Sequence, residues 1–294
     1  MSSISIIEII WEGWIVIADD FFRAYDALLD AWPADVAAVD VPTPFGSTRV
    51  NVCGPESAVP ILLLPGGGAT STVWANNIGA LSRRHRVYAV DVMGDVGRSV
   101  NAGAPMRSVD DLFVWLDSIL DHFGSASATV VGHSYGAMIG LAYALHDARR
   151  IDGLVLLDPT SCFAGMSPKY LLRAVPLLIR PTEKRQRNLI GWEAAGAEVD
   201  ERWLDVTALG AATFGRTRLV VPRRPSADAL GGLTVDTTVV LAGDSRAHDV
   251  GRVAENVRKT VPAATVTTIN GTTHHALPMA ASHAVDAAIL CAVG

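Results

Sequence analysis

The stretch Ala128-Thr-Val-Val-Gly-His-Ser-Tyr-Gly-Ala-Met-Ile-Gly140 decides the fold of this 294-residue chain. It reads as a β-branched strand, a turn and a helix that begins with small residues. The turn, Gly132-His-Ser-Tyr-Gly136, has the pattern G-x-S-x-G. Glycines two residues to either side of Ser134 leave room for a turn sharp enough to lift its hydroxyl clear of the sheet. Ser134 is therefore predicted to be a nucleophile, and the competing interpretation is a serine in an ordinary strand-to-helix turn.

Strands and helices alternate on both sides of this stretch. Helical spacing predicts helices at about 21–32 and 71–81, from Ser108, at 250–260 and from about 281. Continuous apolar runs predict buried strands at 58–64 and 151–157, and further strands are predicted at 86–90, 237–242 and 265–269. Such alternation is typical of an α/β fold with a doubly wound, mostly parallel sheet and right-handed crossovers.

The alternation stops between about residues 160 and 232. This region mixes prolines, arginines and scattered aromatic residues, and we interpret it as a helical cap inserted over the sheet rather than an independent domain. The predicted organisation is an apolar N-terminal helical segment (1–36), the first part of the core (37–159), the cap (160–232) and the second part of the core (233–294).

Composition limits the classes of partner. Half of the residues are apolar, enough for a large core, and a net charge of −6 without a basic cluster argues against nucleic acid. The three cysteines are scattered without a Cys-x-x-Cys pair, which favours neither a disulfide framework nor a zinc site. No metal or cofactor is expected, and a reducing cytoplasm is the simplest setting.

The apolar segment 4–17 needs a separate interpretation. The first basic residue is Arg23 and no small-residue cleavage site follows, so a signal peptide is not predicted. Glu8 and Glu12 interrupt the segment and argue against membrane contact by residues 4–17. A surface or partner-packing segment is favoured, with membrane contact as the alternative, and a homodimer is left open.

A serine hydroxyl needs a base to take its proton and a third group to orient that base. When the nucleophile sits on such an elbow, the partners follow in the order serine, acid, histidine, each on a loop after a strand. The loop 270–275 directly follows the last predicted strand and ends in two histidines. His274 is predicted to be the base, with His275 as its rival. The alternative is a pair of ordinary polar loop residues.

Three aspartates compete for the role of the acid. Asp244 and Asp249 follow the predicted strand 237–242, and Asp158 follows the strand 151–157. Each has a structural explanation: Asp244 as a turn residue, Asp249 as a helix cap and Asp158 as a brace for the turn at Pro159. We favour Asp249, then Asp244, then Asp158.

The loop Pro65-Gly-Gly-Gly68 is the predicted partner of the serine turn. An oxyanion is stabilised by backbone N–H groups already in place, here those of Tyr135 and of Gly67 or Gly68. Gly68 and His133 are also predicted to contact the substrate. A phosphate cradle is disfavoured, because neither a following Lys-Ser/Thr nor G-x-G-x-x-G spacing is present.

The motifs 65–68, Asp91-x-x-Gly-Asp-x-Gly-Arg-Ser99, 132–136 and Gly-Thr-Thr-His274 together resemble the α/β-hydrolase superfamily, and within it bacterial carboxylesterase-like members, from about residue 40 onward. Two positions depart from the pattern. Pro65 stands where these proteins usually carry histidine, and Arg246 stands where many relatives carry the acid. Some carboxylesterases that resemble this chain place the acid further along the loop, as Asp249 would be.

The expected function is a serine hydrolase that cleaves a carboxylic ester or lactone of a hydrophobic small molecule through an acyl-enzyme on Ser134. Acyl transfer, carbon–carbon bond hydrolysis and lyase chemistry use the same triad and stay open as alternatives. A non-catalytic ligand-binding protein of this fold is the alternative from another class. The resemblance disfavours a haloalkane dehalogenase or epoxide hydrolase, since either needs aspartate at position 134.

Overall fold

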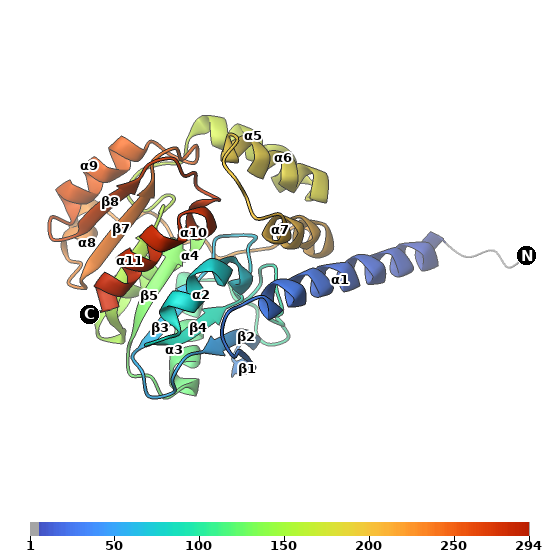
Figure 1. Cartoon of the computed structure of the whole chain (residues 1–294), viewed down its shortest axis with the longest axis horizontal. Coiled ribbons are helices and arrows are strands. Elements are labelled where there is room, and N and C mark those ends of the chain that lie inside the picture. Colours follow the sequence, from blue (N-terminus) through green and yellow to red (C-terminus); the bar gives the residue numbers. More distant parts are fainter. Residues whose placement is uncertain (1–5, 294) are drawn as a thin grey trace, which may run out of the picture.

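The computed structural model describes the backbone of residues 6–293 and the side chains of residues 18–293, so residues 4 and 5 of the apolar segment lie outside the described residues. One eight-stranded sheet runs through the molecule in the order β1-β2-β4-β3-β5-β6-β7-β8 (Figure 1). The strands are β1 (Ala37–Thr43), β2 (Gly46–Cys53), β3 (Pro60–Leu64), β4 (Arg86–Val90), β5 (Ala128–His133), β6 (Ile151–Leu157), β7 (Thr237–Ala242) and β8 (Thr265–Ile269). The pairs β1–β2 and β2–β4 are antiparallel and the others parallel, which confirms the predicted fold class.

Helices cover both faces of this sheet. On one face α3 (Val109–His122), α4 (Tyr135–His146) and α9 (Val250–Thr260) bury one apolar cluster. On the other face α2 (Ala75–Leu81), α10 (Leu277–Ala280), α11 (Ser282–Val293) and part of α1 (Ile6–Asp30) bury a second. Strand β3 divides its side chains between the two clusters, Leu62 and Leu64 on one side and Ile61 and Leu63 on the other, because successive side chains on a strand point to opposite faces.

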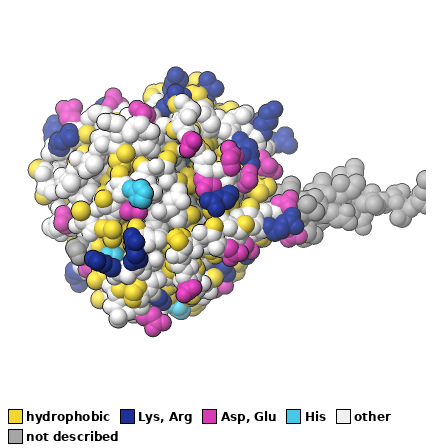
Figure 2. All heavy atoms as spheres, in the orientation of Figure 1, with side chains coloured by type: hydrophobic (Ala, Val, Ile, Leu, Met, Phe, Trp, Pro, Cys, Tyr) yellow, Lys and Arg dark blue, Asp and Glu magenta, His cyan; other side chains and the backbone are white. Residues whose placement is uncertain are grey.

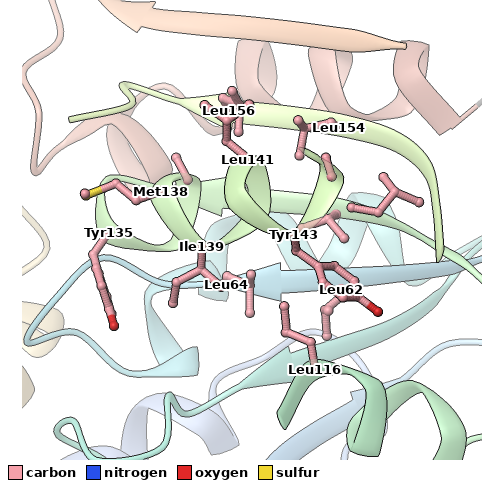
Figure 3. Close-up of a cluster of buried hydrophobic side chains, with 14 of the residues drawn as sticks. Leu62, Leu64, Leu116, Tyr135, Met138, Ile139, Leu141, Tyr143, Leu154 and Leu156 are labelled. Carbon is pink, nitrogen blue, oxygen red and sulfur yellow. The ribbon is translucent and has the colours of Figure 1, made fainter. Parts of the chain in front are cut away.

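Helix α4, which follows the serine turn, lies against the centre of the sheet. Figure 3 shows its side chains Ile139 and Leu141 between residues of β3 and β6, with Leu116 of α3 completing the cluster. The close fit depends on glycine in the turn. A Cβ added to Gly136 would lie 2.2 Å from the carbonyl oxygen of Leu64, and one added to Gly132 would lie 2.3 Å from the carbonyl oxygen of Gly136. The helix therefore touches the strands backbone to backbone at this point.

Helix α1 is longer than the predicted helix over 21–32, because it begins at Ile6 and runs without a break to Asp30. Figure 1 shows its first half extending away from the rest of the molecule. Its second half is anchored: Phe21 packs edge-on against Phe214, and the buried Tyr25 hydroxyl donates to Oδ2 of Asp91 at 3.0 Å. Within residues 6–293 no helix is long and apolar enough to cross a membrane.

Four helices lie between β6 and β7, in the region 160–232: α5 (Pro168–Ile179), α6 (Glu183–Ala194), α7 (Glu201–Phe214) and α8 (Ala227–Gly231). Each begins at a side-chain cap, provided by Ser167, Thr182, Asp200 and Ser226. Figure 1 shows α5, α6 and α7 grouped beyond one end of the sheet, and α7 packs against α1. The chain therefore leaves the sheet after β6, crosses one end of it and returns at β7.

We expect Gly136→Ala to lower the free energy of unfolding by about 3 kcal/mol, because its methyl group must push helix α4 away from β3. Gly191→Ala is the matched control: Gly191 lies inside α6, and its added Cβ would meet no atom within 4 Å. That substitution should raise the free energy of unfolding by about 0.5–1 kcal/mol through helix propensity. Urea denaturation of the two variants measures both values, and a Gly136→Ala variant as stable as the parent would contradict the close packing.

Candidate active site

Ser134 is the single residue between the end of β5 and the start of α4. Its backbone has φ 52° and ψ −109°, a conformation that costs a non-glycine residue on the order of 1–3 kcal/mol. Its N–H donates to the carbonyl oxygen of Leu157 at 3.0 Å, which ties the turn to β6. Although Ser134 is the N-cap of α4, its side chain caps no backbone group. The hydroxyl is therefore available for other partners at the end of the sheet.

The partner of this hydroxyl is the ring of His274. The histidine lies on the loop after β8, is 2 % exposed, and places Nε2 2.9 Å from Oγ of Ser134. Its other ring nitrogen, Nδ1, lies 2.7 Å from Oδ2 of Asp158. With Asp158 ionised, the ring proton belongs on Nδ1, and Nε2 is left free to accept the proton of the serine.

His275, the rival candidate, faces the cap. Its Nε2 lies 3.0 Å from the Tyr170 hydroxyl of α5, and its backbone N–H donates to Oε2 of Glu193 at 3.1 Å. Burial, with the neighbouring His274 ring as the second cause, lowers the pKa of His275 to about 4, so this ring is neutral at pH 7. The structure therefore brings His274 to Ser134 and directs His275 towards α5.

Asp158 lies directly after β6 and is fully buried. Its Oδ1 accepts the N–H of Ala242 at 3.0 Å and Nε2 of His248 at 3.1 Å, and its Oδ2 accepts the Ser245 hydroxyl at 2.8 Å besides His274. Burial alone would raise the pKa of this carboxyl, but the hydrogen bonds from His248 and His274 hold the pKa well below its ordinary range. Asp158 is therefore a carboxylate whose oxygens are each satisfied by two donors.

Asp249, the aspartate favoured from the sequence, does not contact His274, and the structure corrects that preference. Asp249 is exposed, and its Oδ1 accepts the N–H of Arg252 at 2.9 Å as the N-cap of α9. Asp244 is also exposed, in the turn after β7, where its N–H donates to the carbonyl oxygen of Thr272. Each fills the structural role that the sequence allowed for it. Asp158, the third choice, is the aspartate that contacts His274.

Two residues near the histidine were missed in the sequence. His248 lies in the same loop as Asp244 and Asp249, is 4 % exposed, and contacts the carboxylate of Asp158. Glu193 of α6 is fully buried, and its Oε1 accepts the N–H of His274 at 2.9 Å. His248 could have been found as a donor beside the candidate acids in its loop. Glu193 had no signal, because it reaches the site from the cap.

His133 is not placed to contact a substrate, contrary to the prediction. Its ring is buried and its Nε2 lies 2.9 Å from the carbonyl oxygen of His274, to which it donates. Burial lowers the pKa of His133 well below its ordinary value, so the ring stays neutral. Its contact instead supports the backbone of the loop that carries His274.

The glycine loop lies beside the serine turn. The N–H of Gly68, whose φ is 74°, donates to Oδ2 of the buried Asp95 at 2.8 Å. A Cβ added to Gly67 would lie 3.6 Å from Cβ of Tyr135, so these two residues are neighbours across the turn. Because the Gly68 N–H is bonded to Asp95, Gly67 is the better of the two predicted donors.

Comparison with known proteins agrees with this geometry. The sequence model of the alpha/beta hydrolase family matches residues 61–288, which include the serine turn, Asp158 and both loop histidines. The chain belongs to the α/β-hydrolase family. The predicted superfamily is thereby confirmed.

Two carboxylesterases of Bacillus subtilis are similar to this α/β-hydrolase. Carboxylesterase YbfK is 34% identical over 157 residues, which are 53% of each chain, and the uncharacterized carboxylesterase nap is 31% identical over 143 residues, 49% of this chain and 47% of the relative. The matched part thus spans about half the length of these relatives. The crystal structure of carboxylesterase CesB (YbfK) has a TM-score of 0.84 at 24% identity and covers 92% of this chain and 97% of its own. The structure of naproxen esterase, also with a TM-score of 0.84, is 22% identical over 92% of this chain and 96% of its own.

The burial of Asp95 beside the glycine loop predicts a pH-dependent stability. Burial raises the pKa of Asp95 to about 6, so the native protein binds more protons than the unfolded chain between about pH 4 and 6. The contribution of this carboxyl to stability is therefore largest at low pH and is lost as the pH rises through about 6. Asp95→Asn does not titrate, and its free energy of unfolding relative to the parent should rise by roughly 2–3 kcal/mol from about pH 4 to about pH 7. Urea denaturation at the two pH values measures this difference, and a difference that falls with pH would contradict it.

Proposed function

We propose that this α/β-hydrolase is a serine hydrolase that cleaves a carboxylic ester or lactone of a hydrophobic small molecule. The observation that carries the proposal is the continuous line of hydrogen bonds from Asp158 through His274 to Ser134, with distances of 2.7 and 2.9 Å. This is the arrangement of acid, base and nucleophile that acyl transfer to serine requires.

In the first half of the reaction Oγ of Ser134 attacks the carbonyl carbon of the ester while Nε2 of His274 takes the hydroxyl proton. The resulting imidazolium carries a positive charge next to the Asp158 carboxylate, which stabilises it without being protonated itself. Collapse of the tetrahedral intermediate breaks the bond to the alcohol oxygen, and His274 returns the proton to that oxygen. Ser134 is left as an acyl-enzyme.

The second half repeats these steps with water. His274 takes a proton from a water molecule that attacks the acyl carbon, and the carboxylic acid leaves as Ser134 regains its proton. In both halves the negative oxygen needs donors already aimed at it, for which we propose the backbone N–H groups of Gly67 and Tyr135. The Tyr135 N–H lies in the first turn of α4, where backbone donors have no partner within the helix.

The side chains around the serine favour an apolar substrate. Thr160 and Met138 lie on one side, where the Thr160 hydroxyl is 3.4 Å from Oγ of Ser134. On the side of the glycine loop, Leu219 lies 3.8 Å from the position of a Cβ on Gly67. We propose that these residues and Tyr170, on the buried face of the cap helix α5, line the acyl or alcohol site, as apolar walls with few polar groups do in small-molecule sites. The names of the relatives, both carboxylesterases, support an ester as the substrate.

The cytoplasmic setting expected from the cysteines stays a prediction. All three are free thiols, with Cys53 and Cys162 buried. Burial raises the pKa of the Cys53 thiol to about 11, which suits apolar packing rather than a second nucleophile.

A fluorophosphonate probe tests the nucleophile directly. The parent protein should be labelled on Ser134 and should hydrolyse p-nitrophenyl esters, whereas Ser134→Ala should show no label and lose about 10⁶-fold in kcat. Mass spectrometry locates the label, and a panel of esters, lactones and thioesters ranks the substrate classes. A parent protein that neither takes the label nor turns over any of the panel would favour the non-catalytic alternative.

The acid is tested by a matched pair of isosteric substitutions. Asp158→Asn should lower kcat by about 10⁴-fold, because the amide no longer fixes the Nδ1 proton of His274 or stabilises its positive charge. Asp249→Asn should keep nearly full activity, since asparagine is as good an N-cap as aspartate. Circular dichroism confirms that both variants are folded. Loss of activity in Asp249→Asn together with its retention in Asp158→Asn would reverse the assignment.

A further inference from the structure

Helix α5 carries a stripe of exposed apolar side chains. Nine large hydrophobic residues of the described part of the chain are exposed, and five of them lie on this one helix: Leu171, Leu172, Val175, Leu178 and Ile179. Leu172 is 73% and Ile179 67% exposed. With 3.6 residues per turn, the five side chains fall within a stripe about 120° wide. Apolar residues gathered in this way mark a contact surface, whereas scattered ones do not.

Basic residues accompany the stripe. Lys169 and Arg173 lie on one side of the same helix, beside the apolar residues, and Arg180 follows the helix as its C-cap. Residues 168–187, which include the first turn of α6, contain six basic residues and a single acid, Glu183, although the whole chain has a net charge of −6. Figure 2 shows hydrophobic and basic side chains together at the upper edge of the molecule, where α5 lies. The local charge is thus opposite to that of the protein as a whole.

We propose that this face of α5 docks on an anionic lipid surface. An interfacial helix places leucine-type side chains at the boundary between headgroups and acyl chains and keeps lysine and arginine at the level of the phosphates. The basic residues of 168–187 are attracted to a negative leaflet, and the acidic remainder of the protein is repelled, so charge alone turns α5 towards the lipid. The apolar stripe then supplies contact area at the surface.

A second copy of the chain is the less favoured occupant. In a symmetric dimer the same patch meets itself. Arg187 is paired with Asp205 and Glu201 of α7. The other five basic residues of one copy would therefore face those of the second copy with only Glu183 in each to offset them. An anionic surface neutralises those charges instead. The apolar stripe alone would suit either a lipid surface or a second copy of the chain, and the basic residues favour the anionic lipid surface.

The opposite face of α5 reaches the candidate active site. Tyr170 is buried there, with its hydroxyl 3.0 Å from Nε2 of His275, and its ring packs edge-on near His274. Docking on α5 would therefore bring the helix that contacts the loop of His274 and His275 to the lipid surface, where apolar esters concentrate. The surface contact itself does not depend on the proposed esterase activity, because it is formed by residues on the outer face.

Sedimentation with vesicles tests the proposal on the full chain. We expect the protein to bind vesicles of phosphatidylcholine with phosphatidylglycerol about tenfold or more tightly than vesicles of phosphatidylcholine alone, and to be released at about 0.5 M salt, where charges are screened within a few ångströms. Leu172→Ser with Ile179→Ser should lower the binding about tenfold or more, because the apolar contact is lost. Val59→Ser with Val114→Ser, which removes exposed valines far from α5 in the sequence, is the matched control and should bind as the parent does.

Two results would overturn the lipid contact of α5. Binding that persists in the Leu172→Ser/Ile179→Ser variant would point to another segment, such as residues 4–17. No binding to anionic vesicles, with a concentration-dependent dimer in sedimentation velocity that the same variant abolishes, would favour a second copy of the chain. Turnover of a short p-nitrophenyl ester without vesicles should be equal in all variants, so a failure of the lipid contact is distinguishable from a failure of the proposed activity.

Discussion

The buried carboxylate of Asp158 is the point at which three loops of this α/β-hydrolase are joined. Its backbone N–H donates to the carbonyl oxygen of Val240 in β7. Its carboxylate accepts hydrogen bonds from the end of β7 and from the loop that follows, and His274 contacts it from the loop after β8. A buried charge without partners would cost several kcal/mol, so the surrounding donors must be in place for the native structure to form. The hydrogen bond from His274 therefore helps to satisfy the buried carboxylate of Asp158 and at the same time orients the His274 ring.

Four histidines lie in this site, and their contacts differ. His248 and His274 contact the carboxylate, His133 donates to the carbonyl oxygen of His274, and His275 contacts the Tyr170 hydroxyl. Burial holds His133 and His275 neutral, so neither competes with His274 for positive charge next to the two buried anions, Asp158 and Glu193. Glu193 accepts the backbone N–H groups of His274 and His275 and thereby fixes the loop on which they lie. The cap helix α6 thus takes part in positioning the base, although it lies outside the sheet.

The parts of this fold that could be predicted from the sequence are those determined by local chemistry. The serine turn was predictable because only glycine tolerates the contacts at positions 132 and 136, and the buried strands because their apolar runs have no other stable place. The contact of His274 with Ser134 was foreseeable because the loop after the last strand offers histidine. Helical spacing over 21–32 indicated only the second half of helix α1, and its start at Ile6 could not be located within the apolar segment 4–17.

The aspartate that contacts His274 could not be predicted because the choice depends on distances between strands, which a sequence does not contain. Strands β6 and β7 are parallel neighbours, so their ends lie about 5 Å apart, and a carboxylate after either one can reach a histidine on the loop after β8. In this chain the loop after β7 contributes His248 and Ser245 as donors, and the carboxylate comes from Asp158 after β6. The selection of one aspartate among three therefore belongs to the tertiary structure, which buries Asp158 and leaves Asp249 exposed to cap a helix.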